Sequence, residues 1–216
     1  MPLRGRTRIK FSRARVVLTA GAAGVAGDLA AVRWEDGLMT RYVALLRGIN
    51  VAGSNKIAMA DLRALFAAMG YAEIITYLHS GNAVFTAGAQ PADVLARAIR
   101  DGIAACLGTK VTVVIRTAGQ FAAVVAANPL GIEPVNPSRF FVAFLSAAIS
   151  PAATYVTGAR ASGDDRVWIT GSEAFLWCPK GFSVLDHTSM IEKTFSVSAT
   201  TRNWNTVTKL ASLAGT

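Results

Sequence analysis

From residue 39 onward, hydrophobic and polar positions alternate with two different periods, and this pattern predicts strands and helices in a regular order. Short apolar runs that end at glycine or other turn residues predict strands over 42–47, 74–78, 83–86, 110–116, 140–145, 166–170 and 174–178. Apolar residues three and four positions apart predict helices over 59–69, 91–107, 120–127, 189–195 and 204–213. A short alanine-rich helix is expected after Pro151, and a last strand near 198–201 is expected to be short or missing.

The first half of this series has the order β-α-β-β-α-β, and the second half has the order β-α-β-β-α. Because the first order is the split βαβ pattern, the sequence predicts an α+β fold made of two packed ferredoxin-like (α/β-plait) units. The first unit, with its connecting helix, is expected over 39–128 and the second over 129–216. The boundary is expected in the proline-containing stretch 128–137.

Several element ends are predicted from single residues. Gly70 and Gly108 are expected to end their helices, because glycine adopts the left-handed conformation without a Cβ clash. Ser80-Gly81-Asn82 is expected to form a turn in which Asn82 takes a positive φ. The last helix is expected to be capped by the side chain of Thr201 or Asn203.

Composition and charge limit the function classes. Hydrophobic residues make up 52% of the 216 residues and charged residues 16%, which excludes disorder over the whole length. The net charge is +9, but residues 1–38 hold seven basic and three acidic residues, a net of +4. That extension is expected to be poorly ordered or to precede a true start at Met39, with a natural basic tail or a signal peptide as alternatives. The charge of residues 39–216 is therefore only moderately positive and is weak support for an anionic partner.

Known catalytic and metal-binding motifs are not found in the sequence. Two cysteines and two histidines, far apart, exclude a zinc finger, an iron–sulfur motif and a disulfide scaffold. Lys56 does not directly follow Gly53, as a nucleotide-binding P-loop requires, and there is no G-x-S-x-G. The uncharged stretch 140–159 is interrupted by proline and glycine and does not predict a transmembrane helix. No cofactor, metal or membrane partner is expected, and the expected location is the cytoplasm.

Three sequence blocks carry a family resemblance. They are LRGINVAGSNKIAMADLRALF, TYLHSGNAVF and TTRNWNTVTKL, in this order between residues 40 and 213. Together they resemble the bacterial "domain of unknown function 1697" family. The resemblance implies a small bacterial protein with two packed α/β-plait units and no established activity. This sequence departs from the family pattern at Ala52, at His79 and in residues 1–38.

The same blocks concentrate polar side chains at the ends of predicted elements, where a scaffold presents functional groups. We expect these side chains to form one polar ligand-binding site, and no residue is assigned a catalytic role. The candidates are Arg47, Asn50, Asn55, Lys56, Ser80, Asn82, Arg202, Asn203 and Asn205.

Several interpretations of this site stay open. It is expected to bind a small molecule or an anion, and an enzyme acting on a phosphorylated or acyl substrate is the alternative. Weak nucleic-acid binding is a lesser alternative, because the third strand lacks the aromatic pair of an RNA-recognition motif. The third alternative is a structural clasp, in which these polar groups form hydrogen bonds with one another and bind no ligand. For Arg202, a salt bridge to Asp186 competes with ligand binding. The sequence indicates neither the ligand nor the oligomeric state.

Overall fold

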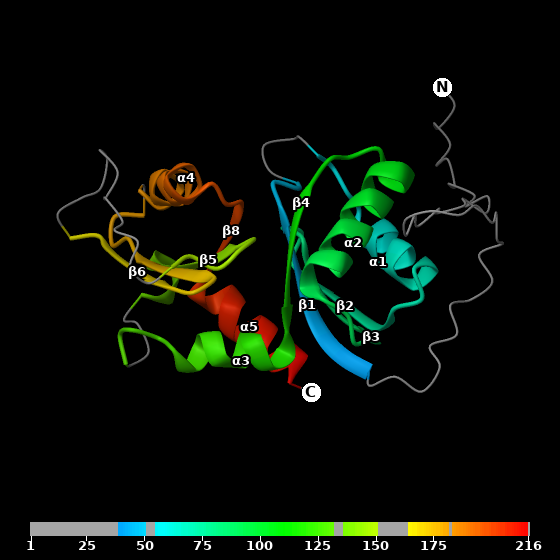
Figure 1. Ribbon diagram of the computed structural model, residues 1–216, viewed down its shortest axis with the longest axis horizontal. Helices are drawn as coiled ribbons and strands as arrows, with labels where there is room; N and C mark the ends of the chain where they lie inside the picture. The colour runs from blue at the N-terminus through cyan, green and yellow to red at the C-terminus, as the bar shows by residue number, and fades with distance from the viewer. Residues whose placement is uncertain (1–38, 51–54, 132–135, 151–163, 182, 216) are drawn as a thin grey trace, which may run out of the picture. The chain divides into compact units, whose positions relative to one another are not determined.

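The computed structural model describes residues 39–50, 55–131, 136–150, 164–181 and 183–215. The predicted extension over 1–38 and the predicted helix after Pro151 lie outside the described residues. Within them the fold is α+β, with two four-stranded antiparallel sheets and five α-helices, as Figure 1 shows.

The first sheet has helices α1 and α2 on one face. Its strands are β1 (Met39–Arg47), β2 (Ala72–Tyr77), β3 (Asn82–Gly88) and β4 (Thr112–Thr117), in the order β2-β3-β1-β4. Helices α1 (Met59–Ala68) and α2 (Ala92–Leu107) bury apolar stripes, including Phe66 and Ile99, against Tyr42 and Phe85 of the sheet. Burying such large apolar side chains is the main favourable contribution to folding.

The second sheet has helix α4 on one face. Its strands are β5 (Phe140–Leu145), β6 (Arg166–Thr170), β7 (Glu173–Trp177) and β8 (Ala199–Asn203), in the order β6-β7-β5-β8. A short 3-10 helix (Pro137–Arg139) precedes β5, and α4 (Val184–Phe195) packs Ile191 against the sheet. The last strand, expected to be short or missing, is present as five residues of β8.

Helices α3 (Ala118–Ala126) and α5 (Trp204–Ala214) bury the remaining faces of both sheets (Figure 1). Each begins directly after an edge strand, α3 after β4 and α5 after β8. Their shared core contains Val43 and Val84 of the first sheet, Phe144 of the second, Phe121 of α3 and Trp204 of α5. An RNA-recognition motif binds RNA on an open sheet face. Here that face of the first sheet is covered.

The two sheets are equivalent in strand order and in the register of their central strands β1 and β5. Val43 in the centre of the first sheet pairs with Arg116 on the edge strand β4, and Val142 in the second sheet pairs with Arg202 on β8. Two residues further along the central strands, Leu45 pairs with Asn82 and Phe144 with Glu173. Arg116 therefore corresponds to Arg202. Asn82 corresponds in the same way to Glu173.

Two of the predicted helix ends are confirmed, and one turn prediction is wrong. Gly70 and Gly108 follow α1 and α2 with φ values of 82° and 65°. In the turn before β3, the positive φ values belong to Leu78 (56°) and Gly81 (80°), whereas Asn82 begins the strand. Glycine is also required at 81 by packing, because a Cβ there would lie 2.7 Å from the Cβ of Leu46.

Candidate functional site

The turn over residues 79–82 joins the three sequence blocks. The Asn50 side-chain amide donates a hydrogen bond to the carbonyl of His79 (2.7 Å). Arg202 Nη2 donates to the carbonyl of Ser80 (3.1 Å), although the two residues are 122 positions apart. The predicted site residues of the first, second and third blocks thus meet at this turn.

Arg202 is a cation whose described hydrogen-bond partners are all neutral. Nε donates to Oδ1 of Asn82 (2.5 Å), and Nη2 donates to the carbonyl of Leu46 (2.7 Å) as well as to the turn. Nη1 donates to the Thr200 hydroxyl and the Thr201 carbonyl, both at 2.9 Å. Burial disfavours the charged form and lowers the pKa of Arg202 from its usual value to about 10. Arg202 therefore stays charged at neutral pH.

Arg202 does not form the salt bridge with Asp186 that the sequence offered as the alternative to ligand binding. No carboxylate of the described residues lies within salt-bridge distance of Arg202. Its partner is Asn82, which is fully buried. The Asn82 amide nitrogen also donates to the carbonyl of Tyr77 (3.0 Å) and the hydroxyl of Ser80 (3.1 Å). Both amide hydrogens of Asn82 are thus used inside the protein.

Two asparagines hold the loop that follows β1. Asn50 and Asn55 adopt positive φ values of 56° and 49°. The side chain of Asn50 accepts from the amide of Ile57 (2.9 Å) and donates to its carbonyl (2.9 Å), and Asn55 Nδ2 donates to the carbonyl of Gly48 (3.2 Å). Both asparagine side chains therefore hold the loop, but Asn50 is partly buried, whereas Asn55 and Lys56 are exposed.

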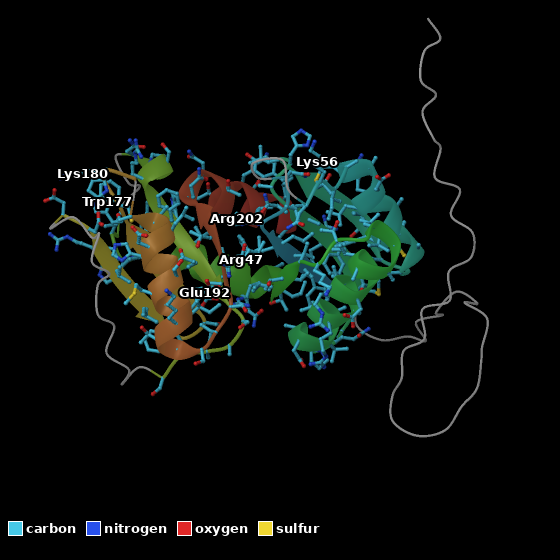
Figure 2. The ribbon with its side chains drawn as sticks, turned by 90° about the horizontal axis from the view of Figure 1, so that it is seen from above. Arg47, Lys56, Trp177, Lys180, Glu192 and Arg202 are labelled. Atoms are coloured by element: carbon cyan, nitrogen blue, oxygen red, sulfur yellow. The ribbon has the colours of Figure 1, made fainter. Side chains whose placement is uncertain are left out.

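Arg47 connects the end of β1 to the second sheet's helix. Its guanidinium forms a salt bridge with Glu192 of α4, and the Arg47 side chain is 44% exposed. The same carboxylate oxygen of Glu192 accepts from the backbone amide of Ala199 at the start of β8 (2.8 Å). Figure 2 shows Arg47, Glu192 and Arg202 gathered together, with Lys56 to one side of them.

The start of α5 confirms one of the two predicted caps. Asn203 Oδ1 accepts from the amide of Thr206 (3.0 Å), which is the N-cap bond. Asn203 is thereby engaged in the helix, whereas Asn205 is exposed. Of the nine predicted site residues, four use their side chains to hold the fold: Asn50, Asn82, Arg202 and Asn203. The other five are exposed: Arg47, which also pairs with Glu192, and Asn55, Lys56, Ser80 and Asn205.

Arg116 makes the equivalent set of contacts in the opposite direction. Its Nη2 donates to the carbonyls of Leu145 (2.8 Å) and Ser172 (3.0 Å), as Arg202 does to Leu46 and Gly81. Its guanidinium carbon also lies 6.0 Å from the centroid of the Phe144 ring. The partner of its Nε, however, is the carboxylate of Glu173 (2.8 Å). The two arginine contacts thus differ in one respect: a carboxylate faces Arg116 and an amide faces Arg202.

Two clefts lie away from the turn over residues 79–82. One of about 220 Å³ is bounded by α3 and the β6–β7 hairpin, including Arg116, Gln120 and Glu173. Another of about 320 Å³ lies along α2 and β4, including Arg97 and Arg100. Neither is lined by a residue that the sequence predicted to bind ligand.

Sequence spacing did not reveal a group of three potential metal ligands. One atom from each of Asp165, Cys178 and His187 lies within 4.8 Å of the others. Burial and the negative charge of Asp165 raise the pKa of the Cys178 thiol to about 11, although a hydrogen bond with Ser183 opposes this. A signal was present in the sequence: extending the β6–β7 register one pair beyond Arg166 and Trp177 puts Asp165 opposite Cys178.

A membrane-spanning helix is not found in the part of the chain that the structure describes, since none of its helices is both long and apolar enough.

The fold and the polar turn define an α+β protein with two antiparallel sheets of equivalent strand order. The chain belongs to the family described as "Protein of unknown function (DUF1697)", whose model matches residues 39–175. This confirms the family resemblance, and the first two of the three sequence blocks lie within the matched residues.

One solved structure supports the fold. The chain is similar to the conserved bacterial protein SP0830 from Streptococcus pneumoniae, with a TM-score of 0.57 and 22% sequence identity. The similarity covers 82% of this chain and 99% of that one. No curated protein matches the chain significantly.

Proposed function

We propose that this protein is a binding module for a small phosphorylated or otherwise anionic molecule, held beside the turn over residues 79–82. The ligand would contact the exposed groups of Lys56, Asn55 and Ser80, with Arg47 at the edge of the site. Lysine and arginine donors are suited to phosphate because their hydrogen bonds to an anion are charge-assisted. A ligand of this kind fits a protein of the bacterial cytoplasm.

One observation carries this proposal: the charge of Arg202 is not neutralised by its neighbours. Arg116 has Glu173 as its partner, but the equivalent position opposite Arg202 is the neutral Asn82. Arg47 and Lys56 add two more cations around the same turn. Among the described residues, only Glu192 pairs with any of these three cations, through Arg47. The excess positive charge would attract an anion to this end of β1.

Arg202 would act on the ligand through its charge rather than by direct contact. Its three nitrogens already donate to Asn82, to Thr200 and Thr201, and to the carbonyls around the turn. A partly buried charge is weakly screened by salt, so it can strengthen binding at the surface. A bound anion would in turn favour the charged form of Arg202.

We also propose that the two sheets are two ferredoxin-like units over 39–128 and 129–216. The identical strand order and the matching pairs of the central strands support this, as do the matching contacts of Arg116 and Arg202. The site would then lie where the first unit meets the edge strand of the second, and junctions of this kind often bind ligands.

The test is binding of inorganic phosphate, measured by calorimetry on the full chain and on two lysine variants. Lys56→Ala is expected to weaken binding about tenfold, the effect of losing one charge-assisted hydrogen bond. Lys180→Ala is the matched control, because Lys180 is exposed and lies on the opposite side of Arg202 from Lys56 in Figure 2. Equal phosphate affinity of the Lys56→Ala variant and the wild type would refute the proposal.

Two further measurements separate the alternatives. Conversion of a phosphorylated compound that binds at this site would favour the enzyme. For nucleic acid, binding of a 20-nucleotide oligouridylate is measured at several salt concentrations. If Lys56 contacts a phosphate of the chain, Lys56→Ala lowers the salt dependence by about one unit of slope. An unchanged slope excludes Lys56 from nucleic-acid binding.

A further inference from the structure

Three side chains of different chemistry meet at the end of the β6–β7 hairpin, and none of them belongs to the proposed anion site. Asp165 directly precedes β6, Cys178 directly follows β7, and His187 lies in the first turn of α4. The hairpin register sets Asp165 opposite Cys178, and α4 begins close enough to add His187. Their potential ligand atoms all lie within 4.8 Å of one another.

All three side chains are buried. The side chains of Asp165 and His187 are both 0% exposed, and Cys178 is also 0% exposed. His187 Nε2 lies 3.1 Å from Asp165 Oδ2. Buried carboxylates are costly unless they are paired or coordinate a metal. The cluster therefore fits either an internal Asp–His pair or a metal site.

The sulfur position favours the metal site over a catalytic thiol. In a nucleophile–base–carboxylate arrangement, the thiol and the carboxylate contact opposite nitrogens of the imidazole. Here the thiol and a carboxylate oxygen both lie within 4.8 Å of the same imidazole nitrogen and of each other. A common central ion requires such mutual proximity, because ligand atoms around tetrahedral Zn²⁺ are roughly 3.3–3.8 Å apart. Side-chain movements of about 1 Å would bring the three ligand atoms to this separation.

We propose that Asp165, Cys178 and His187 bind one Zn²⁺, which fastens the start of α4 to the end of the β6–β7 hairpin. One thiolate, one imidazole and one carboxylate form a ligand set that suits Zn²⁺. Mg²⁺ and Ca²⁺ prefer oxygen ligands throughout. The ion would join the two segments, and a water molecule would take the fourth position of its tetrahedral coordination. This proposal does not depend on anion binding.

The experiment uses the full chain without a histidine tag, freed of metal by chelation and then titrated with Zn²⁺ and, separately, Co²⁺. We expect one equivalent of either metal per chain. At 100-fold excess over its dissociation constant, Zn²⁺ should raise the melting temperature by about 5–10 °C. Bound Co²⁺ should show the visible bands of a tetrahedral site and a thiolate-to-metal charge-transfer band.

The Cys106→Ser variant keeps the test decisive even if changes at buried Cys178 prevent folding. Cys106 is the other free cysteine and lies on α2. With Cys106→Ser, Cys178 is the only thiol, so a retained charge-transfer band assigns the ligand without altering the site. In a folded Cys178→Ser variant the band should disappear and Zn²⁺ affinity should fall at least 100-fold.

Three results would overturn the proposal. They are no Zn²⁺ binding by the wild type, a Co²⁺ spectrum without a thiolate band, and loss of that band in Cys106→Ser. The first result would leave Asp165 and His187 as a metal-free pair, and either of the others would show that Cys178 is not a metal ligand.

Discussion

Each half of the molecule extends one arginine from its edge strand to the other half, and the two arginines differ in their partner. Arg116 on β4 reaches the second sheet and pairs with Glu173. Arg202 on β8 reaches the first sheet and pairs with Asn82. The positions are equivalent in register, and both guanidinium groups also donate to backbone carbonyls of the opposite half.

Because of this difference, we expect Arg116 to serve mainly stability and Arg202 to serve anion binding as well. The buried cation Arg116 is neutralised by its carboxylate partner, and removing either partner leaves the other as an uncompensated charge. A cation with only neutral partners keeps its field, at the cost shown by the lowered pKa of Arg202. The same contact geometry can thus serve as a clasp on one side and as a source of positive potential on the other.

Replacing the paired arginine should have the largest effect on stability. Arg116→Met removes the counter-ion of Glu173, whose side chain is only 16% exposed. It also leaves the carbonyls of Leu145 and Ser172 without this donor. We expect the free energy of unfolding in urea to fall by about 3–4 kcal/mol.

An exposed arginine provides the control for this experiment. Arg97 pairs with Asp93 on the surface of α2, so Arg97→Met should change stability by less than about 0.5 kcal/mol. Adding Glu173→Leu to Arg116→Met should recover part of the loss, since no charge is then stranded. If the stability losses of the single variants Arg116→Met and Glu173→Leu add up to the loss of the double variant, the Arg116–Glu173 pair is not energetically coupled.

Replacing the unpaired arginine should cost less. Arg202→Met leaves neutral acceptors without a donor, at Leu46, Ser80 and Asn82, but strands no carboxylate. We expect a loss of about 2 kcal/mol in the same urea experiment. A loss equal to or above that of Arg116→Met would mean that the charge of the partner does not distinguish the two contacts.

The elements of this fold were predictable because their signals are local. Helix α2 follows from apolar spacing, and its end follows from Gly108, which has a φ of 65°. The sequence left open whether strand β8 forms, because its stability comes from pairing with β5 rather than from its own sequence. The helix cap was narrowed to two residues, and the structure selects Asn203.

The contacts within the site were not predictable in the same way. The partner of Arg202 is 120 residues away, and local sequence offered Asp186 instead. The sequence did identify the blocks that meet at the turn over 79–82. It could not tell which polar groups are consumed internally, because that depends on long-range packing. The Asp165–Cys178–His187 group required the hairpin register, which follows from the two-residue loop between Thr170 and Glu173.

The substitution with the smallest expected effect on stability gives Arg202 a carboxylate partner. Asn82→Asp is nearly isosteric and would give Arg202 the kind of partner that Arg116 has. The charged hydrogen bond to Arg202 is gained, but the donors to Tyr77 and Ser80 are lost. These changes should offset each other to within about 1 kcal/mol.

The effect of Asn82→Asp on binding should be clear even though stability changes little. Because the new carboxylate neutralises Arg202, phosphate affinity should fall about tenfold, which corresponds to about 1.4 kcal/mol of lost electrostatic attraction. Asn82→Ala is the control, since it removes the same amide without adding charge and should bind phosphate as the wild type does while unfolding more easily. If Asn82→Asp binds phosphate normally, the charge of Arg202 plays no part in anion binding. Arg202 would then be a clasp like Arg116, with the neutral partner carrying no functional meaning.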